Sequence, residues 1–312
     1  MKQSIKKIIY QKSGLGYLVD KMKKDITNSV SENFNSIVAR ELLKARLDER
    51  NFLSKESGNF SNEKYFGSHI IVSLTTYGKR VHEVYLTIET LMQQTLMPNK
   101  IILWLNKDHF SDENIPISLK KLQNRGLLIE YCKDVRSYTK IIPALIKYPD
   151  EVIITVDDDM LYPRNMVENL VNSYKQNPEL IHFRRGHRMK FDDSGQLQNY
   201  INWYWDISDS NIDKLNFPTG VGGVLYPPQS LHKDTTNKEL FLKLAPAADD
   251  VWLKAMAILQ GTLSKKVFTH NMNKKEDYLI NGGEDEIALF HSNITQNDVQ
   301  LKAVFDHYNL FK

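Results

Sequence analysis

Three consecutive carboxylates, Asp157, Asp158 and Asp159, directly follow a short apolar run at residues 152–156. A run dominated by β-branched apolar residues predicts a strand that is buried on both faces. Open α/β sheets have their ligand crevice at the carboxyl ends of the strands, where these carboxylates would lie. Asp157 and Asp159 are two residues apart, so in extended backbone their side chains would point to the same side. Converging carboxylates repel each other unless a cation lies between them. Because Mg²⁺ and Mn²⁺ take one or two protein carboxylates and add water and phosphate, we predict Asp157 and Asp159 as ligands of a divalent metal ion.

Other interpretations of this triplet remain open. An acidic surface turn, or a helix cap before Pro163, would use the same residue types. A phosphatase or phosphotransferase could use an Asp at a strand end as its nucleophile, with a second Asp two residues later. That class typically has Thr or Val two positions after the second Asp, where this chain has Leu161.

Two further polar loops follow predicted strands. The loop at residues 75–80 combines hydroxyls, an aromatic ring and an arginine at the expected start of a helix, where a nucleoside and its phosphates could bind. The loop at residues 137–140 ends on Lys140, which could reach a phosphate. Either loop could also be a plain polar turn. Together with the carboxylates they form three sites at strand-to-helix junctions that one ligand could touch.

The elements that must position these loops alternate along the chain. Apolar runs at residues 70–74, 101–105 and 127–131 predict strands before the one at 152–156, and helical patterns separate them. Such alternation predicts βαβ units and hence an α/β fold with a mostly parallel sheet and right-handed crossovers.

Composition limits the class of protein. The chain has 312 residues, 41% apolar and 25% charged, which is ordinary for a globular protein. Its formal charge of +3 is too small to imply nucleic acid. One cysteine, Cys132, allows no internal disulfide and fits a reducing compartment. No apolar run approaches the roughly 20 residues of a membrane span, and we see no signal-peptide pattern, so we expect a cytoplasmic protein.

The first 60 residues differ from the rest. Residues 1–24 hold seven lysines and one aspartate, a net charge of +6, so the remainder carries −3 of the total +3. Apolar residues recur between the lysines at roughly helical spacing, and a Ser-, Asn- and Gly-rich stretch at 54–68 follows as a linker. We predict a helical N-terminal extension at 1–60. Its basic helix could lie on an anionic membrane surface, at the inner face of the membrane, or pack on its own domain or a second subunit.

Four ordered segments resemble the nucleotide-sugar-dependent glycosyltransferases of the GT-A fold. More narrowly, they look like bacterial glycosyltransferases encoded with capsule and cell-surface polysaccharide genes. The segments are residues 72–80, 153–159, 222–227 and 248–254. The resemblance covers about 69–310, leaves 1–60 outside, and implies a GT-A-like (Rossmann-like) domain at 65–312.

The resemblance also implies roles for individual residues. Asp157 and Asp159 match the DxD motif, whose metal ion bridges to the donor diphosphate. We further predict contacts with the nucleotide-sugar donor at Thr75, Tyr77, Arg80, Lys140, Asp158 and Arg185.

Asp249 and Asp250 match the acidic motif at a helix start that supplies the base in inverting members. A carboxylate there could take the proton of an acceptor hydroxyl. We predict Asp249 as the helix N-cap and Asp250 as the base. The resemblance thus implies a metal-assisted glycosyltransferase that moves a sugar from a nucleotide-sugar donor to a saccharide or lipid-linked glycan acceptor in surface polysaccharide synthesis. With Asp250 as the base, the expected outcome is inversion. A non-catalytic sugar-binding protein on a degenerate transferase fold is the remaining alternative.

Overall fold

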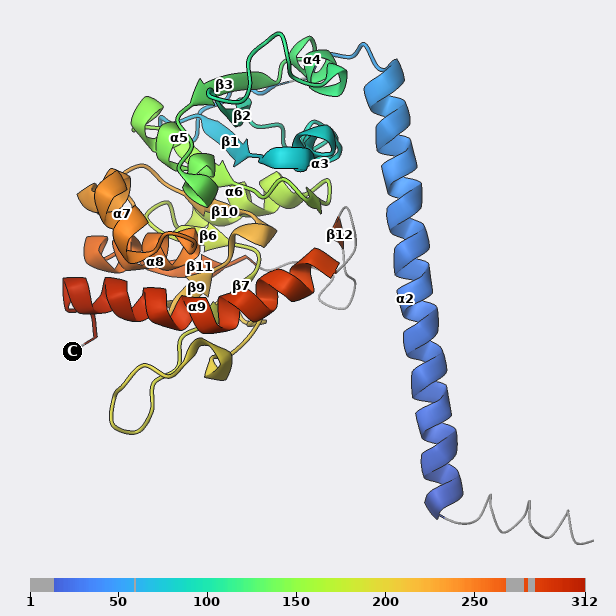
Figure 1. Ribbon diagram of the computed structural model, residues 1–312, viewed down its shortest axis with the longest axis vertical. Helices are drawn as coiled ribbons and strands as arrows, with labels where there is room; N and C mark the ends of the chain where they lie inside the picture. Colours follow the sequence, from blue (N-terminus) through green and yellow to red (C-terminus); the bar gives the residue numbers. More distant parts are fainter. Residues whose placement is uncertain (1–13, 59, 268–277, 280–283, 312) are drawn as a thin grey trace, which may run out of the picture. The chain divides into compact units, whose positions relative to one another are not determined.

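The computed structural model describes residues 14–58, 60–267, 278–279 and 284–311. The chain divides into two compact units, Met1–Arg46 and Leu47–Lys312. The helix α2 (Gly14–Leu53) forms the described part of the first unit and continues into the second (Figure 1). The predicted N-terminal helical segment is thus confirmed from Gly14 onward, whereas residues 1–13 of the basic stretch lie outside the described residues. Within the described part of the chain, no helix has the length and apolarity needed to cross a membrane.

An eight-stranded mixed sheet organises the second unit. Its strands follow the order β3-β2-β1-β4-β10-β6-β11-β8. The first four in this order are mutually parallel: β3 (Leu128–Cys132), β2 (Lys100–Asn106), β1 (Ile70–Thr75) and β4 (Val152–Thr155). The other four include antiparallel pairs: β10 (Val224–Tyr226), β6 (Ile181–Phe183), β11 (Ser264–Lys266) and β8 (Ile212–Asp213). The predicted α/β architecture with a mostly parallel sheet is therefore confirmed.

Short strand pairs and helices complete this unit. Two small sheets pair β5 (Met160–Leu161) with β12 (Tyr278–Leu279) and β7 (Gly186–Arg188) with β9 (Asn216–Pro218). The α-helices are α3 (Val84–Leu91), α4 (Ile117–Gln123), α5 (Ile142–Lys147), α6 (Met166–Gln176), α7 (Lys238–Leu244), α8 (Asp249–Gln260) and α9 (Glu284–Tyr308). Short 3₁₀ turns are η1 (Gly78–His82), η2 (Arg136–Lys140), η3 (Tyr200–Asn202), η4 (Gly220–Gly222) and η5 (Lys233–Thr236).

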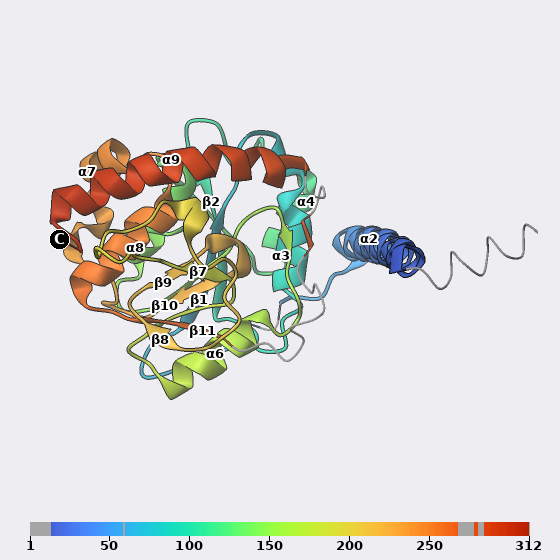
Figure 2. The same cartoon turned by 90° about the horizontal axis from the view of Figure 1, so that it is seen from below.

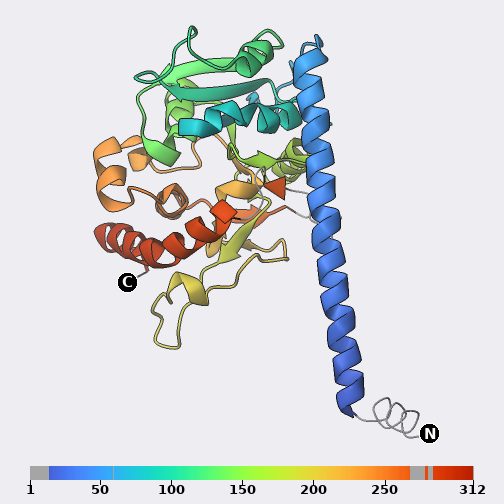
Figure 3. The ribbon, with the colours of Figure 1, turned by 45° about the vertical axis from the view of Figure 1, so that its right-hand side comes forward.

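The pleat of the strands assigns helices to the two faces of the sheet. Leu225 of β10 packs in one core cluster together with residues of α3 and α6. Its neighbours Val224 and Tyr226 point to the other face and join a cluster built on α8. Because successive strand residues alternate between faces, α6 and α8 cover opposite faces (Figure 2). The helix α9 packs against α8 (Figure 2; red helix in Figure 3).

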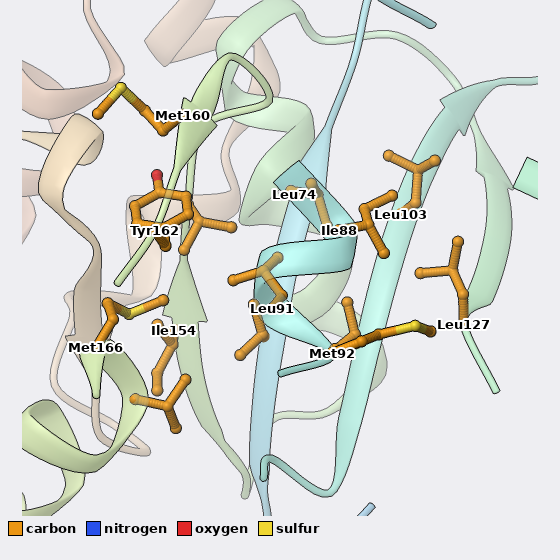
Figure 4. Close-up of a cluster of buried hydrophobic side chains, with 14 of the residues drawn as sticks. Leu74, Ile88, Leu91, Met92, Leu103, Leu127, Ile154, Met160, Tyr162 and Met166 are labelled. Atoms are coloured by element: carbon orange, nitrogen blue, oxygen red, sulfur yellow. The ribbon is translucent and has the colours of Figure 1, made fainter. Parts of the chain in front are cut away.

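The first of these clusters fixes the register of the strands that end at the polar loops. Leu74 of β1, Leu103 of β2 and Ile154 of β4 are fully buried beneath Ile88 and Leu91 of α3 (Figure 4). A slip of one residue would turn these side chains to the opposite face, so the apolar pattern specifies the pairing strongly. The carboxyl ends of β1 and β4 therefore stand side by side.

A buried ion pair lies near the end of α2, inside the second unit. Glu89 of α3 is fully buried, and Arg125, which follows α4, is 3% exposed. Both terminal nitrogens of Arg125 donate to the Glu89 carboxylate, Nη2 at 3.2 Å. Arg50 Nε lies 3.4 Å from Glu89 Oε2, and Asn51 donates to the same carboxylate at 3.3 Å. This carboxylate thus joins α2, α3 and the end of α4.

We expect Arg125→Met to lower the free energy of unfolding by about 3–5 kcal/mol, because it leaves a buried carboxylate with weaker compensation. Urea denaturation at pH 7 measures the change. The double variant Glu89→Met/Arg125→Met is the matched control and should lose less, since it removes both charges. A single variant as stable as the parent would contradict this role.

Candidate active site

The predicted loops meet at a cavity of about 660 Å³ at the carboxyl ends of β1 and β4. Six of the predicted site residues line it: Thr75, Tyr77, Arg80, Lys140, Asp157 and Asp158. Asp159, Asp249, Asp250 and Arg185 are not among the lining residues. The cavity wall also includes Asp134 and Arg136, which follow β3 and were not predicted. A polar stretch after a third parallel strand was the signal that could have indicated them.

The carboxylate triplet forms a turn instead of the predicted extended backbone. β4 ends at Thr155, and Asp158 and Asp159 form a turn before β5. Asp158 accepts hydrogen bonds from Thr76 Oγ1 at 2.6 Å and from Arg80 Nη1 at 3.1 Å. Asp159 Oδ2 lies 3.1 Å from the same Arg80 nitrogen. The expectation of two side chains projecting from one side of a strand is therefore wrong, because the chain turns immediately after β4.

Lys140 joins the end of β4 to the start of α8. Its Nζ donates to Asp157 Oδ1 at 2.8 Å and lies 3.0 Å from Asp249 Oδ2. Burial alone would lower the pKa of Lys140, but the carboxylates of Asp157, Asp249 and Asp250 hold its pKa well above the ordinary value. The backbone of Lys140 is also anchored, since its carbonyl accepts a hydrogen bond from Ser73 Oγ of β1 at 2.6 Å. Lys140, predicted to reach a phosphate, here bridges two carboxylates.

The two acids that open α8 lie differently from the prediction. Ala248 occupies the N-cap position and makes no side-chain cap, and Asp249 is the first residue of the helix. The predicted N-cap role of Asp249 is wrong, because its buried carboxylate faces Lys140 instead. Asp250 Oδ2 accepts a long hydrogen bond, 3.4 Å, from Gly220 N. Burial raises the pKa of Asp250 to about 7, and the neighbouring Asp249 adds to this while Lys140 opposes it.

The glycine turn η4 packs against Lys140 and Asp157. A Cβ at Gly220 would lie 2.6 Å from Lys140 Nζ and 3.3 Å from Asp157 Oδ1, so only glycine leaves room for their ion pair. Tyr162 ties this turn to the end of β4, since its hydroxyl accepts from Asp157 N at 2.9 Å and donates to Val221 O at 3.1 Å. Arg185 packs against the same turn, since a Cβ at Gly222 would lie 2.8 Å from the Cβ of Arg185. Arg185 does not line the cavity.

The site carries an excess of negative charge. Five carboxylates face the cations Lys140 and Arg80 in the contacts described above: Asp157, Asp158, Asp159, Asp249 and Asp250. Burial and the nearby charge of Asp157 together raise the pKa of Asp159 to about 6, while Arg80 opposes this rise.

This donor chemistry fits a divalent cation with few protein ligands. The described residues contain no cluster of three or more His, Cys, Asp or Glu side chains suited to a metal ion. Mg²⁺ and Mn²⁺ need no such cluster, because one or two carboxylates suffice when a ligand phosphate supplies further oxygens. Asp157 and Asp159 are the residues predicted to hold the ion; in the structure Lys140 contacts the first and Arg80 contacts the second.

Comparisons with known proteins give only distant likenesses. No family model and no curated protein matches the chain. One similar solved structure is CMP:2-keto-3-deoxy-manno-octonic acid synthetase complexed with CTP, with 11% identity, 65% of this chain and 90% of that chain covered, and a TM-score of 0.39. HddC from Yersinia pseudotuberculosis has 13% identity, 72% and 99% coverage, and a TM-score of 0.39. The mannosyltransferase PcManGT from Pyrobaculum calidifontis, in complex with GDP-Man and Mn²⁺, has 14% identity, 50% and 45% coverage, and a TM-score of 0.31. At these TM-scores the likenesses carry no argument about function.

Asp250 makes stability depend on pH in a predictable direction. An unfolded aspartate releases its proton near pH 4, whereas folded Asp250 keeps it to about pH 7. The folded state then binds more protons between these values, so its stability falls as the pH rises from about 4 to 7. We expect Asp250→Asn to raise the free energy of unfolding at pH 8 by on the order of 2–4 kcal/mol, with no difference below about pH 4.

Urea denaturation over pH 4 to 8 measures this difference. Asp193→Asn, at an exposed aspartate in the turn after β7, is the matched control and should follow the parent at every pH. Parallel curves for Asp250→Asn and the parent would show that Asp250 ionises normally.

Proposed function

We propose that this protein is a glycosyltransferase that moves a sugar from a nucleotide-sugar donor to a saccharide or lipid-linked acceptor. The observation that supports this most is the bridge made by Lys140. It connects a carboxylate on the wall of a nucleotide-sized cavity to a pair of carboxylates at a helix start. One end of the site thus offers groups for a diphosphate and the other a proton acceptor.

The cavity suits the nucleotide part of the donor. Its volume of about 660 Å³ lies within the roughly 300–1,000 Å³ range of small-molecule sites. Tyr77, 73% exposed, offers a free aromatic face for a base, and the hydroxyls of Thr75 and Thr76 line the same wall. Arg80 provides a charge for phosphate, while Asp158 holds its guanidinium in place.

The reaction would use the two ends together. The acceptor oxygen forms a bond to the anomeric carbon as the bond from that carbon to the phosphate oxygen breaks, and the nucleoside diphosphate leaves. A divalent ion held by Asp157 and Asp159 would stabilise the charge that develops on the diphosphate. Asp250 takes the proton of the acceptor hydroxyl, and its pKa of about 7 suits a general base near neutral pH. An inverting outcome follows from this role.

A donor screen tests the proposal. Thermal shifts with UDP, GDP and CDP, with and without Mn²⁺, identify the nucleotide, and the matching sugar nucleotides are then assayed for nucleotide release. We expect stabilisation by one nucleotide only when Mn²⁺ is present. The absence of any nucleotide response would favour a non-catalytic protein on a transferase-like fold.

Asp157→Ala and Asp159→Ala should each abolish Mn²⁺-dependent nucleotide binding, since each removes one of the two carboxylates that would hold the ion. Isothermal titration of the nucleotide identified above, with and without Mn²⁺, measures this. Asp193→Ala is the control and should bind like the parent, because Asp193 is exposed and lies in the turn after β7. Parent-like Mn²⁺-dependent affinity in both site variants would disprove the metal assignment.

Asp250→Asn should lower turnover by about 10²–10⁴-fold and leave donor affinity unchanged, because a general base acts only in the chemical step. Asp249→Asn should chiefly lower the melting temperature, since it removes one of the two carboxylates that contact buried Lys140 directly. Steady-state turnover with the identified donor separates the two variants. If Asp249→Asn abolishes turnover and Asp250→Asn does not, the roles are exchanged.

A further inference from the structure

A buried lysine lies one helical turn beyond Asp250. Lys254 of α8 is 2% exposed, and its Nζ makes no hydrogen bond to any described residue. The charge of Asp213 in β8 partly offsets the effect of burial on the pKa of Lys254. The Asp213 carboxylate already accepts from Leu215 N at 2.9 Å and lies 3.7 Å from Arg188 Nε. An ammonium or amine without partners is costly in a protein interior, so this group needs an explanation.

Lys254 and Asp250 line the same small cavity. Their spacing of four residues places both on one face of α8. Both line a space of about 10 Å³, together with Tyr226 and Ser264, and the remaining walls are apolar. Ser264 Oγ is also buried without a hydrogen-bond partner. A space of this size holds one water molecule, which needs two to four polar partners.

We propose that this cavity holds a single water that links Lys254 Nζ to the Asp250 carboxyl group, and that Lys254 acts through it as a positioning residue for the base. Lys254 and Ser264 thereby gain a partner that no described residue offers them. The inference rests on the proposed role of Asp250 in the reaction, but the link itself is a property of the protein without substrate.

Other charges also act on the pKa of Asp250. Asp249 of the same helix and Asp157 after β4 raise it, and Lys140 of η2 lowers it. The charge of Asp250 in turn helps to raise the pKa of the hydroxyls of Tyr226 in β10 and Tyr200 in η3.

Burial lowers the pKa of Lys254 to about 7, so near neutral pH a substantial fraction carries a positive charge. Through the proposed water, that charge would favour the ionised form of Asp250, which is the form a base requires.

Carboxyl-selective NMR tests the link without any need for turnover. The full-length protein is labelled with ¹³C at the aspartate carboxyl groups, and the loss of one signal in Asp250→Asn identifies Asp250. In Lys254→Met we expect the pKa of Asp250 to rise by about one unit, because the facing positive charge is removed. Lys254→Arg should stay close to the parent. Methionine is apolar and of similar length, so the fold should be retained.

Ser264→Ala separates a water link from a direct effect. It removes one ligand of the water and leaves Lys254 in place, so we expect a smaller shift of Asp250 in the same direction. An unchanged Asp250 titration in Lys254→Met overturns the proposal, and an unchanged titration in Ser264→Ala alone overturns the water link.

The pH dependence of turnover then relates the link to the reaction. In Lys254→Met the acidic limb of the turnover profile should move up by the same interval as the NMR titration, with the donor KM unchanged. An unmoved limb despite a shifted Asp250 signal would count against Asp250 as the base and leave the link intact. The two proposals can therefore fail separately.

Discussion

The ammonium of Lys140 is the contact on which the arrangement of the site depends. It lies between Asp157, at the end of β4, and Asp249, at the start of α8. Val152 and Ile154 of β4 pack in one core cluster and the buried residues of α8 in another, so the lysine is a direct polar contact between the two elements. A buried pair of this kind is weak evidence for overall stability, because desolvation offsets much of its attraction. Its effect is positional, since the loss of any member leaves a buried charge uncompensated.

Backbone constraints make that contact possible. The apolar residues of β1 and β4 specify the register that sets the two strand ends side by side. Gly220 then admits the lysine, since any side chain there would meet Nζ. Tyr162 fixes the glycine turn to the carboxylate loop by two hydrogen bonds through one hydroxyl. The site is therefore defined as much by the glycine and the tyrosine as by its charged residues.

The sequence predicts those features that depend on local pattern. The strands from β1 to β4 follow from apolar runs, and the convergence of their loops follows from parallel pairing. Two features depend on partners distant in sequence: the turn at Asp158, whose carboxylate accepts from Thr76 and Arg80, and the partner of Asp249. A helix start followed by two acids predicts a cap when only local contacts count. Here Lys140 competes with the helix amides for the Asp249 carboxylate, and no local pattern contains that lysine.

The excess of carboxylates at the site affects both the stability of the folded state and the protonation of the site residues. Asp159 and Asp250 both hold protons more strongly than an exposed aspartate, chiefly because they are buried and secondly because another carboxylate is close. Such carboxylates destabilise the folded state when they ionise, which is typical of functional sites. The two have different neighbours: Asp159 lies 3.1 Å from Arg80, whereas among the described residues Asp250 accepts a long hydrogen bond from Gly220 N and lines a small cavity with Lys254. These two carboxylates with raised pKa values therefore lie in different surroundings: Asp159 contacts a residue of the large cavity, and Asp250 lines the small one. In the proposed reaction the first would help to hold the metal ion and the second would take a proton.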